Sequence, residues 1–405
     1  MKILCISKYA SPSKYGVGAR LYYLAKKISD SGNNVTLVSS DSNHLATYPI
    51  SRKTYNYETI GNLNHTWIRT YKYGKSSSIK RFLSWIDFDF KLFRMKIQKE
   101  NIPDVVIISS LSLTTIVYGI HLKRKYKCKL IFEVRDIYPL TLTEEMGFSK
   151  YHPAVLLFSI LERKAYKKSD LIVGTMPNLS EHVRNILKKD KYVFHSPIGI
   201  PEIWNRPVEE SIQISQLFPK NKIIVGYAGS MGKSNALEFL VLAIKQMEIL
   251  NPNIYFVLVG EGEKKHDLLS LFRNLNNVTL GPKIKQSEVP YFLSKCDILY
   301  LSTHPSRIWE FGQSMNKVID YMMSGKPVVA SYNGYQSMLN EANSGVFIPV
   351  NSTEMIIESI LKYAEMSHYM RKEIGQQGKE WVTKFYNYDK LSEDYLNEIK
   401  RICGK

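Results

Sequence analysis

The segment Ile223-Ile-Val-Gly-Tyr-Ala-Gly-Ser-Met-Gly-Lys233 passes directly from an apolar run into a glycine-rich loop. A run without polar alternation is typical of a parallel strand that is buried on both faces. Ligands of open α/β sheets bind at the loops that leave such strands, and glycines there let backbone N–H groups approach a phosphate. Lys233 is placed to neutralise that phosphate. A tight turn with a solvated lysine explains the same residues, because the loop lacks the spacing of a Walker motif.

The alternation of apolar runs and amphipathic helical patterns continues on both sides of this segment. Downstream strands are predicted at Tyr255–Val259, Ile298–Ser302 and Pro327–Ala330. Upstream strands are predicted at Lys2–Ser7, Val35–Ser39, Asp104–Ile108, Lys129–Phe132 and Leu171–Gly174. Two such series in tandem predict an α/β protein with two Rossmann-like, doubly wound parallel-sheet domains.

A chain of 405 residues is long enough for two such domains. Four prolines between residues 197 and 219 interrupt a strandless, acidic stretch and predict the hinge. The last residues repeat apolar side chains at helical spacing, so a C-terminal helix is expected, packed on the first domain. We therefore expect a first domain at residues 1–200 with a helix at about 386–405, and a second domain at residues 201–385.

Positive charge is concentrated in the first domain. The first 200 residues hold 32 lysines and arginines against 15 acidic residues, whereas the remainder holds 23 against 22. Such an excess indicates an anionic partner, which could be nucleic acid, an anionic membrane or a lipid pyrophosphate. No signal peptide is recognisable, and four widely spaced cysteines form no CxxC motif, so we expect a cytoplasmic protein.

Four further motifs follow in a fixed order in the second half: Val257–Gly262, Asn277–Gly281, Asp297–Leu301 and Lys317–Val329. In this order and spacing the chain resembles the retaining GT-B glycosyltransferases of the family 4 type, particularly bacterial amino-sugar transferases of surface polysaccharide synthesis. The resemblance covers nearly the whole chain. It implies two domains that face a central cleft, the first binding the acceptor and the second binding the donor. It also implies a UDP-type nucleotide-sugar donor, no cofactor and no metal.

In that family two acidic residues, separated by seven others, flank a Phe-Gly and open a helix that ends before Gly-x-Pro-Val-Val. Glu310-Phe-Gly312 matches the first half, but the position expected for the second acid holds Val318. Asp320 instead lies seven residues before Pro327, where the family places that acid. The resemblance implies that Asp320 binds the donor ribose, since a carboxylate can accept both hydroxyls of a diol. Glu310 would contact the donor sugar, unless it is a solvated loop acid.

Lys317 precedes Asp320 by one helical turn, so both side chains can face one ligand, with the lysine near the diphosphate. A surface salt bridge between them is the alternative. The full set that the resemblance assigns to the donor comprises Gly16, Gly18, Gly229, Ser230, Gly260, Lys283, Ile284, Glu310, Phe311, Gly312, Asn316 and Asp320.

In the first half, Phe132-Glu-Val-Arg-Asp-Ile-Tyr-Pro139 is similar to the Glu-x-Arg-Asp-x-Trp-Pro signature of the amino-sugar transferases. Charged residues that leave a buried strand need partners, which makes Arg135 and Asp136 catalytic candidates. Asp136 would orient an acceptor hydroxyl or the donor sugar, and Arg135 would stabilise the departing diphosphate or hold Asp136. An internal Arg–Asp pair that fixes the loop is the alternative, and Glu133 is expected to be structural.

Retention in this family is explained by front-face attack, in which the leaving phosphate accepts the acceptor's proton. No protein base is then required, and Lys233, Lys317 and helix N-termini would stabilise the departing diphosphate without a metal. Asp87-Phe-Asp89 spells a metal-binding DxD motif, but it lies inside a helical pattern rather than a strand-end loop. We therefore predict no metal site.

The helical pattern that contains this DxD carries two apolar stripes with lysines and arginines between them. This composition is typical of a helix that meets an anionic bilayer and reaches a lipid-linked acceptor. It also fits a buried helix with a charged outer face. We expect a lipid-linked or oligosaccharide acceptor, with peripheral membrane contact at the inner face of the plasma membrane.

Three rival functions remain at this point. A nucleotide-sugar epimerase of the same architecture would form product without any acceptor. A basic nucleic-acid-binding protein would explain the charged first half but not the strand-end loops of the second, so nucleic acid is not expected as a partner. A noncatalytic relative is the third possibility, because the acidic pair is altered.

Overall fold

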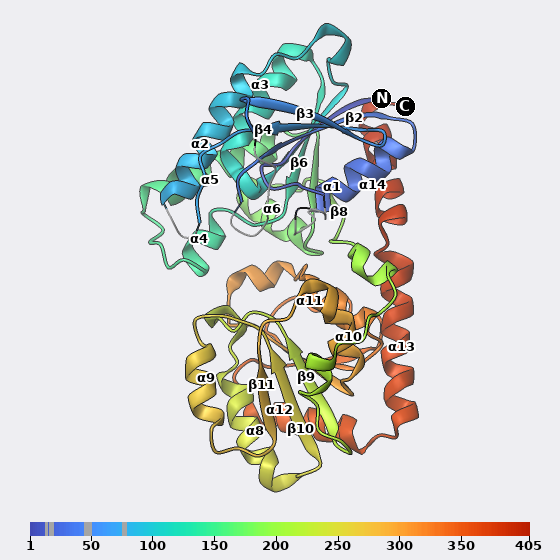
Figure 1. Cartoon of the computed structure of the whole chain (residues 1–405). Coiled ribbons are helices and arrows are strands. Elements are labelled where there is room, and N and C mark those ends of the chain that lie inside the picture. Colours follow the sequence, from blue (N-terminus) through green and yellow to red (C-terminus); the bar gives the residue numbers. More distant parts are fainter. Residues whose placement is uncertain (13–14, 16–19, 44–50, 75–78) are drawn as a thin grey trace. The chain divides into compact units, whose positions relative to one another are not determined.

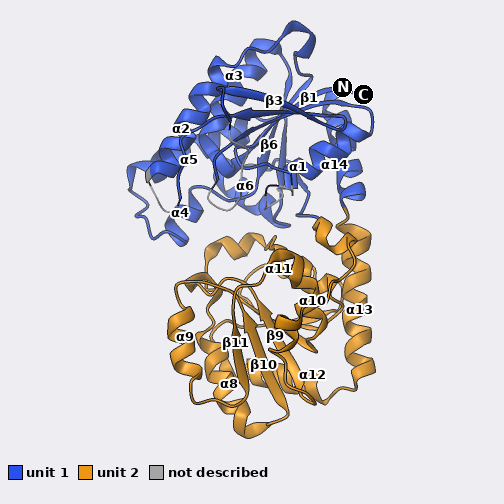
Figure 2. Ribbon diagram, in the orientation of Figure 1, with its two compact units in different colours: residues 1–199, 388–405 blue, residues 200–387 orange. Residues whose placement is uncertain are grey.

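The computed structural model describes the whole chain except residues 13–14, 16–19, 44–50 and 75–78. It divides into two compact units (Figures 1 and 2). Unit 1 comprises Met1–Gly199 and Tyr388–Lys405, and unit 2 comprises Ile200–Asn387. No helix in the described parts of the chain combines the length and the apolar character that a bilayer crossing requires.

The sheet of unit 1 has the strand order β3-β4-β2-β1-β5-β6-β7-β8 over the described residues. Its strands are β1 (Lys2–Ile6), β2 (Asn34–Ser40), β3 (Tyr55–Ile60), β4 (Leu63–Ile68), β5 (Val105–Ser109), β6 (Lys129–Val134), β7 (Leu171–Gly174) and β8 (Val193–His195). All neighbours pair in parallel except β3, which runs antiparallel to β4. The carboxyl ends of the parallel strands therefore share one edge.

Helices cover both faces of this sheet: α1 (Arg20–Asp30), α2 (Ile79–Arg94), α3 (Ile116–Tyr126), α4 (Leu140–Glu144), α5 (Pro153–Lys168), α6 (Leu179–Leu187) and α14 (Tyr388–Cys403). Short 3-10 turns lie at Lys99–Asn101 and Ser110–Thr115. α1 and α14 pack on one face, where Leu24 and Tyr395 join the core around Ile3. α14 is tied to α1 by an ion pair of 2.6 Å between Lys27 and Asp389. α3 and α5 pack on the opposite face.

Unit 2 has a fully parallel sheet of order β11-β10-β9-β12-β13-β14. Its strands are β9 (Ile223–Ala228), β10 (Ile254–Val259), β11 (Val278–Gly281), β12 (Ile298–Ser302), β13 (Val328–Ser331) and β14 (Gly345–Ile348). Its helices are α7 (Ile212–Ser215), α8 (Glu238–Leu250), α9 (Lys265–Phe272), α10 (Val289–Ser294), α11 (Asn316–Met323), α12 (Thr353–Glu365) and α13 (His368–Phe385). Short 3-10 turns lie at Glu202–Asn205, Lys233–Asn235, Gln286–Glu288 and Arg307–Phe311.

Local chemistry fixes the ends and the spacing of these elements. Ser352 and Ser367 cap α12 and α13, because each hydroxyl accepts a backbone N–H three residues later. Strand β9 needs glycine at Gly226, since a Cβ there would overlap Cys296 Sγ. The close approach lets α10 pack directly on the sheet, with α8 and α12 on the opposite face.

The predicted fold class, two doubly wound parallel sheets, is confirmed. The pattern did not indicate the hairpin of β3 and β4. Polar residues alternate along β3, which lies at the sheet edge and is half exposed. Here the Trp67 indole donates to Glu58 over 3.0 Å and so joins the two strands.

Candidate functional site

The first turn of α11 lies against the carboxyl end of β9 in unit 2. The buried Tyr321 hydroxyl accepts a hydrogen bond of 3.0 Å from the backbone N–H of Ala228. At the start of α11 the Gln313 side chain accepts the N–H of Met315 over 3.0 Å. These bonds fix the N-terminus of α11 at the sheet edge where ligands of α/β proteins bind.

Lys317, in this first turn, holds its ammonium group among neutral partners. Its Nζ donates to Asn235 Oδ1 over 2.8 Å and to the Tyr227 hydroxyl over 3.1 Å. It also lies 4.4 Å from the centroid of the Tyr227 ring. Burial lowers the pKa of Lys317 to about 7. An ammonium group with only neutral partners is stabilised by an incoming anion, so this position can bind a phosphate.

The two glycine loops beside Lys317 pack tightly against each other. A Cβ on Gly229 would lie 2.6 Å from Lys317 Cε, and a Cβ on Gly260 would overlap the carbonyl oxygen of Gly229. Gly260 also has a φ of +154°, which disfavours other residues. The backbone of Met231 donates to the carbonyl of Glu261 over 2.9 Å. These glycines therefore have a packing role, and Gly229 leaves the space that the lysine occupies.

Asp320 lies one turn further along α11 and has a different partner. Its Oδ1 accepts a hydrogen bond of 2.7 Å from the Trp204 indole. Burial raises the pKa of Asp320 to about 6, although the Trp204 hydrogen bond acts in the opposite direction. Lys317 bonds Asn235 and Tyr227, whereas Asp320 bonds Trp204. The two side chains therefore have different hydrogen-bond partners and do not form a surface salt bridge with each other.

The loop before α11 places the other predicted acid differently. The side chain of Glu310 is 57% exposed, and its Oε1 lies 3.7 Å from Arg307 Nε in the same turn. Phe311 is buried, whereas Gly312 has a φ of +98° that favours glycine. Glu310 therefore faces solvent.

The remaining predicted residues of unit 2 lie mostly at the surface. Ser230, Lys233, Lys283 and Asn316 are exposed and Ile284 is half-buried. The Ser230 carbonyl accepts a bond of 2.5 Å from the Tyr227 hydroxyl, which links that loop to the lysine cluster. Gly16 and Gly18, predicted for unit 1, lie outside the described residues.

In unit 1, Arg135 and Asp136 follow β6 and are held through their backbone. Both N–H groups donate to Ser110 Oγ, over 2.9 and 3.2 Å. Burial lowers the pKa of Arg135 and raises that of Asp136. Glu133 belongs to the core instead, because it forms an ion pair of 2.6 Å with Arg20 in which both side chains are fully buried.

The sequence patterns missed several polar residues near the strand ends. In unit 1, Lys8 lies two residues after the end of β1 and is buried, with Nζ 3.3 Å from Ser40 Oγ. Burial lowers the pKa of Lys8 to about 7. A lysine shortly after a buried strand was the available signal. Trp204 and Asn235 offered none, since each meets its partner across more than 80 residues of sequence.

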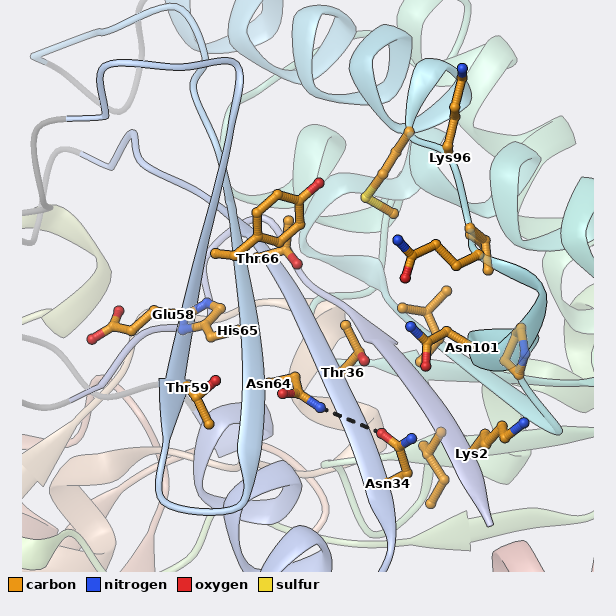
Figure 3. Close-up of a pocket in the computed structure, with 17 residues that line it drawn as sticks. Lys2, Asn34, Thr36, Glu58, Thr59, Asn64, His65, Thr66, Lys96 and Asn101 are labelled. Carbon is orange, nitrogen blue, oxygen red and sulfur yellow. Dashed lines mark hydrogen bonds between the residues drawn. The ribbon is translucent and has the colours of Figure 1, made fainter.

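A separate pocket of about 600 Å³ lies on unit 1 and contains none of the predicted residues. Figure 3 shows its amide and hydroxyl side chains, with Asn64 donating to Asn34 over 3.5 Å. Lys2 and Asn34 begin β1 and β2, so this pocket lies at the amino ends of those strands. It is thus at the opposite strand ends from Lys8.

Asp87 and Asp89, the DxD pair, lie within α2 and bond protein groups. Asp87 pairs with Lys91 over 2.8 Å, and Asp89 accepts from the Thr115 hydroxyl over 2.6 Å. Among the residues that the structure describes, no cluster of three histidines, cysteines or acids suits a metal ion.

Solved structures with this architecture are GT-B enzymes. Sucrose-phosphate synthase from Thermosynechococcus elongatus matches with a TM-score of 0.75 and 16% identity over 99% of both chains. The catalytic domain of starch synthase IV from Arabidopsis thaliana, bound to ADP and acarbose, gives 0.71 and 11%, over 100% of this chain and 99% of that one. HepE from Anabaena, in complex with UDP and glucose, gives 0.64 and 14%, over 99% and 100%. The fold is therefore GT-B.

Residues 208–381 match the family model of glycosyl transferases group 1, and this segment contains the Lys317 cluster and Asp320. No curated protein matches the chain by sequence. Most of unit 2 is therefore similar to a glycosyl transferases group 1 domain.

Proposed function

We propose that the protein transfers an N-acetylated amino sugar, with retention of configuration, from a UDP-type nucleotide sugar to a lipid-linked or oligosaccharide acceptor in bacterial surface polysaccharide synthesis. The carrying observation is the Lys317 ammonium, bonded only to Asn235 and Tyr227 in the bonds described above, beside Asp320 on one helix turn. The amino-sugar and surface-polysaccharide parts rest on the resemblance of residues 132–139.

In this proposal the donor diphosphate binds at the N-terminus of α11. Lys317 and the first N–H groups of the helix neutralise it, and Asp320 accepts the ribose hydroxyls. Lys233, exposed on the adjacent loop, can turn toward the same phosphates. Two observations favour UDP over other nucleotides: the resemblance of the sequence to bacterial amino-sugar transferases, and the UDP bound to HepE. Starch synthase IV, by contrast, was solved with ADP.

Transfer then needs stabilisation of the leaving diphosphate more than a protein base. The acceptor hydroxyl attacks from the face that the phosphate leaves, and the phosphate oxygen takes its proton. The ammonium of Lys317 and the helix N-terminus stabilise the developing charge, so we expect no metal requirement. Arg135 and Asp136, with backbones fixed by Ser110, would position the acceptor side.

A thermal-shift screen tests the donor assignment, because a ligand that binds only the folded state raises the melting temperature. We expect UDP and UDP-sugars to raise it more than ADP or GDP, with and without a chelator. Lys317→Met should abolish the shift, whereas Lys245→Met, an exposed lysine on α8, should keep it. Equal shifts in both variants would reject the site.

Turnover of labelled UDP-N-acetylhexosamines separates the rival functions. Transfer should require an added lipid-linked or oligosaccharide acceptor. Conversion of the donor without acceptor would identify an epimerase, and donor binding without any turnover would identify a noncatalytic relative. Tight, salt-sensitive binding of random DNA without any nucleotide shift would support the nucleic-acid alternative.

A further inference from the structure

Helix α2 buries one apolar stripe and exposes the other. Trp85, Phe88 and Leu92 are at most 5% exposed and pack into unit 1. The outer stripe consists of Phe82, Leu83, Ile86, Phe90 and Phe93, which are between 38% and 55% exposed. Soluble proteins rarely leave so many large apolar side chains together at the surface without a partner.

Helix α5 extends this exposed face. It packs beside α2, because Phe158 stacks on Trp85 with ring centroids 6.2 Å apart, and both helices lie on the same side of unit 1 in Figure 1. Leu156, Leu157 and Ile160 of α5 are 51%, 47% and 54% exposed. We call these three residues and the outer stripe of α2 the outer apolar face.

The exposed charged residues of α2 and α5 are all cationic. The acids of the two helices bond protein groups: Asp87 pairs with Lys91, Asp89 accepts from Thr115, and Glu162 is buried against His182. The exposed charges on α2 and α5 are Lys80, Arg94, Arg163, Lys164, Lys167 and Lys168. The surface therefore combines an apolar centre with positive charge, as an anionic bilayer requires.

A groove of about 400 Å³ adjoins the outer apolar face between α2, α3 and α5. Phe93, Ile120 and Leu161 contribute apolar lining, and Arg124 and Lys168 contribute positive charge. An acyl chain with an anionic headgroup has the same two parts. The groove therefore points to the same kind of partner as the helices.

We infer that the outer apolar face and its basic surround dock unit 1 on an anionic membrane. The inner side of α2 connects this face to the strand ends, since Trp85 donates to the Tyr9 hydroxyl over 2.5 Å. Tyr9 lies three residues after Ile6, the last residue of β1, and so beyond the carboxyl end of that strand. Docking would thus hold the predicted acceptor side near the bilayer. The inference goes beyond the proposed function, because membrane binding needs neither donor nor catalysis.

Vesicle sedimentation of the full chain tests the inference, with phosphatidylcholine vesicles that contain or lack phosphatidylglycerol. We expect binding only to the anionic vesicles, weakening with salt. Ile86→Ser/Phe90→Ser should lower the partition coefficient by roughly 10- to 100-fold. Leu242→Ser/Ile249→Ser on α8, a pair 47% and 84% exposed in unit 2, is the matched control and should bind normally.

A second variant addresses the charge. Lys164→Gln/Lys168→Gln should lower binding to anionic vesicles by about fivefold per lysine and reduce its salt dependence. The inference is overturned if the native protein does not bind anionic vesicles at low salt, or if the α2 and α8 double variants weaken binding equally. It is also overturned if light scattering shows a dimer that the α2 pair dissociates while vesicle binding stays unchanged, because a second copy would then cover the face.

Discussion

Donor affinity should follow a bell-shaped pH profile set by the two groups on α11. The charged form of Lys317 binds the diphosphate, and its pKa of about 7 means that this charge is lost as pH rises above 7. The charged form of Asp320 binds the ribose, and its pKa of about 6 means that it is lost as pH falls below 6. Affinity should therefore be greatest between pH 6 and 7 and should fall by about tenfold per pH unit on the alkaline side.

Calorimetric titration with a UDP-sugar from pH 5 to 9 measures this profile without interference, since the diesterified phosphates of a nucleotide sugar do not titrate there. Lys317→Met should remove the alkaline limb and weaken binding by about 10- to 1000-fold at the optimum. Asp320→Asn should flatten the acid limb and leave the alkaline limb in place. A flat profile in the native protein, or an alkaline limb that persists in Lys317→Met, would refute the assignment.

Three further changes test the surroundings of the site and the core. Trp204→Phe removes the hydrogen bond that lowers the pKa of Asp320, so the acid limb should move up by about one pH unit; an unmoved limb would mean the bond does not act on binding. Gly229→Ala should weaken UDP-sugar binding by about tenfold, because the added methyl group would displace the Lys317 ammonium. Gly232→Ala is the control and should bind normally, since its Cβ would meet its nearest heavy atom only at 3.5 Å. Equal binding by both variants would refute the packing role of Gly229. Glu133→Gln leaves its arginine partner buried and unpaired, so denaturant titration should show a loss of about 3–5 kcal/mol, and a loss below 1 kcal/mol would contradict a buried ion pair.

The fold class could be predicted because it depends on periodicity within short windows. Runs such as Ile298–Ser302 and Leu171–Gly174 are apolar nearly throughout, and both form fully buried parallel strands with the predicted bounds. The edge strand β3 could not be predicted in the same way. Alternate side chains of β3 are exposed, and whether one face of an edge strand stays open to solvent depends on how the whole unit packs.

For the site, only the relative placement of residues on one helix could be predicted. Spacing places Lys317 and Asp320 one turn apart on α11 whatever else the chain does. Their partners Trp204, Tyr227 and Asn235 come from distant segments, so their identity depends on packing. The packing role of Gly229 and Gly260 could not be predicted for the same reason, since each glycine accommodates a neighbour that is remote in sequence.

Two lysines with a lowered pKa, Lys8 in unit 1 and Lys317 in unit 2, lie near the carboxyl ends of central strands, and their surroundings explain why only Lys317 is assigned to the donor. Burial lowers the pKa of both Lys8 and Lys317 to about 7. Burial is the largest cause at both, but at Lys8 the carboxylates of Asp41 and Asp89 oppose it while the nearby cations Lys72 and Arg81 add to it, whereas at Lys317 burial acts alone. Carboxylates already supply counter-charge to Lys8, whereas an added phosphate would supply the missing counter-charge at Lys317. The anion site is therefore expected in unit 2, where the ammonium has only neutral hydrogen-bond acceptors.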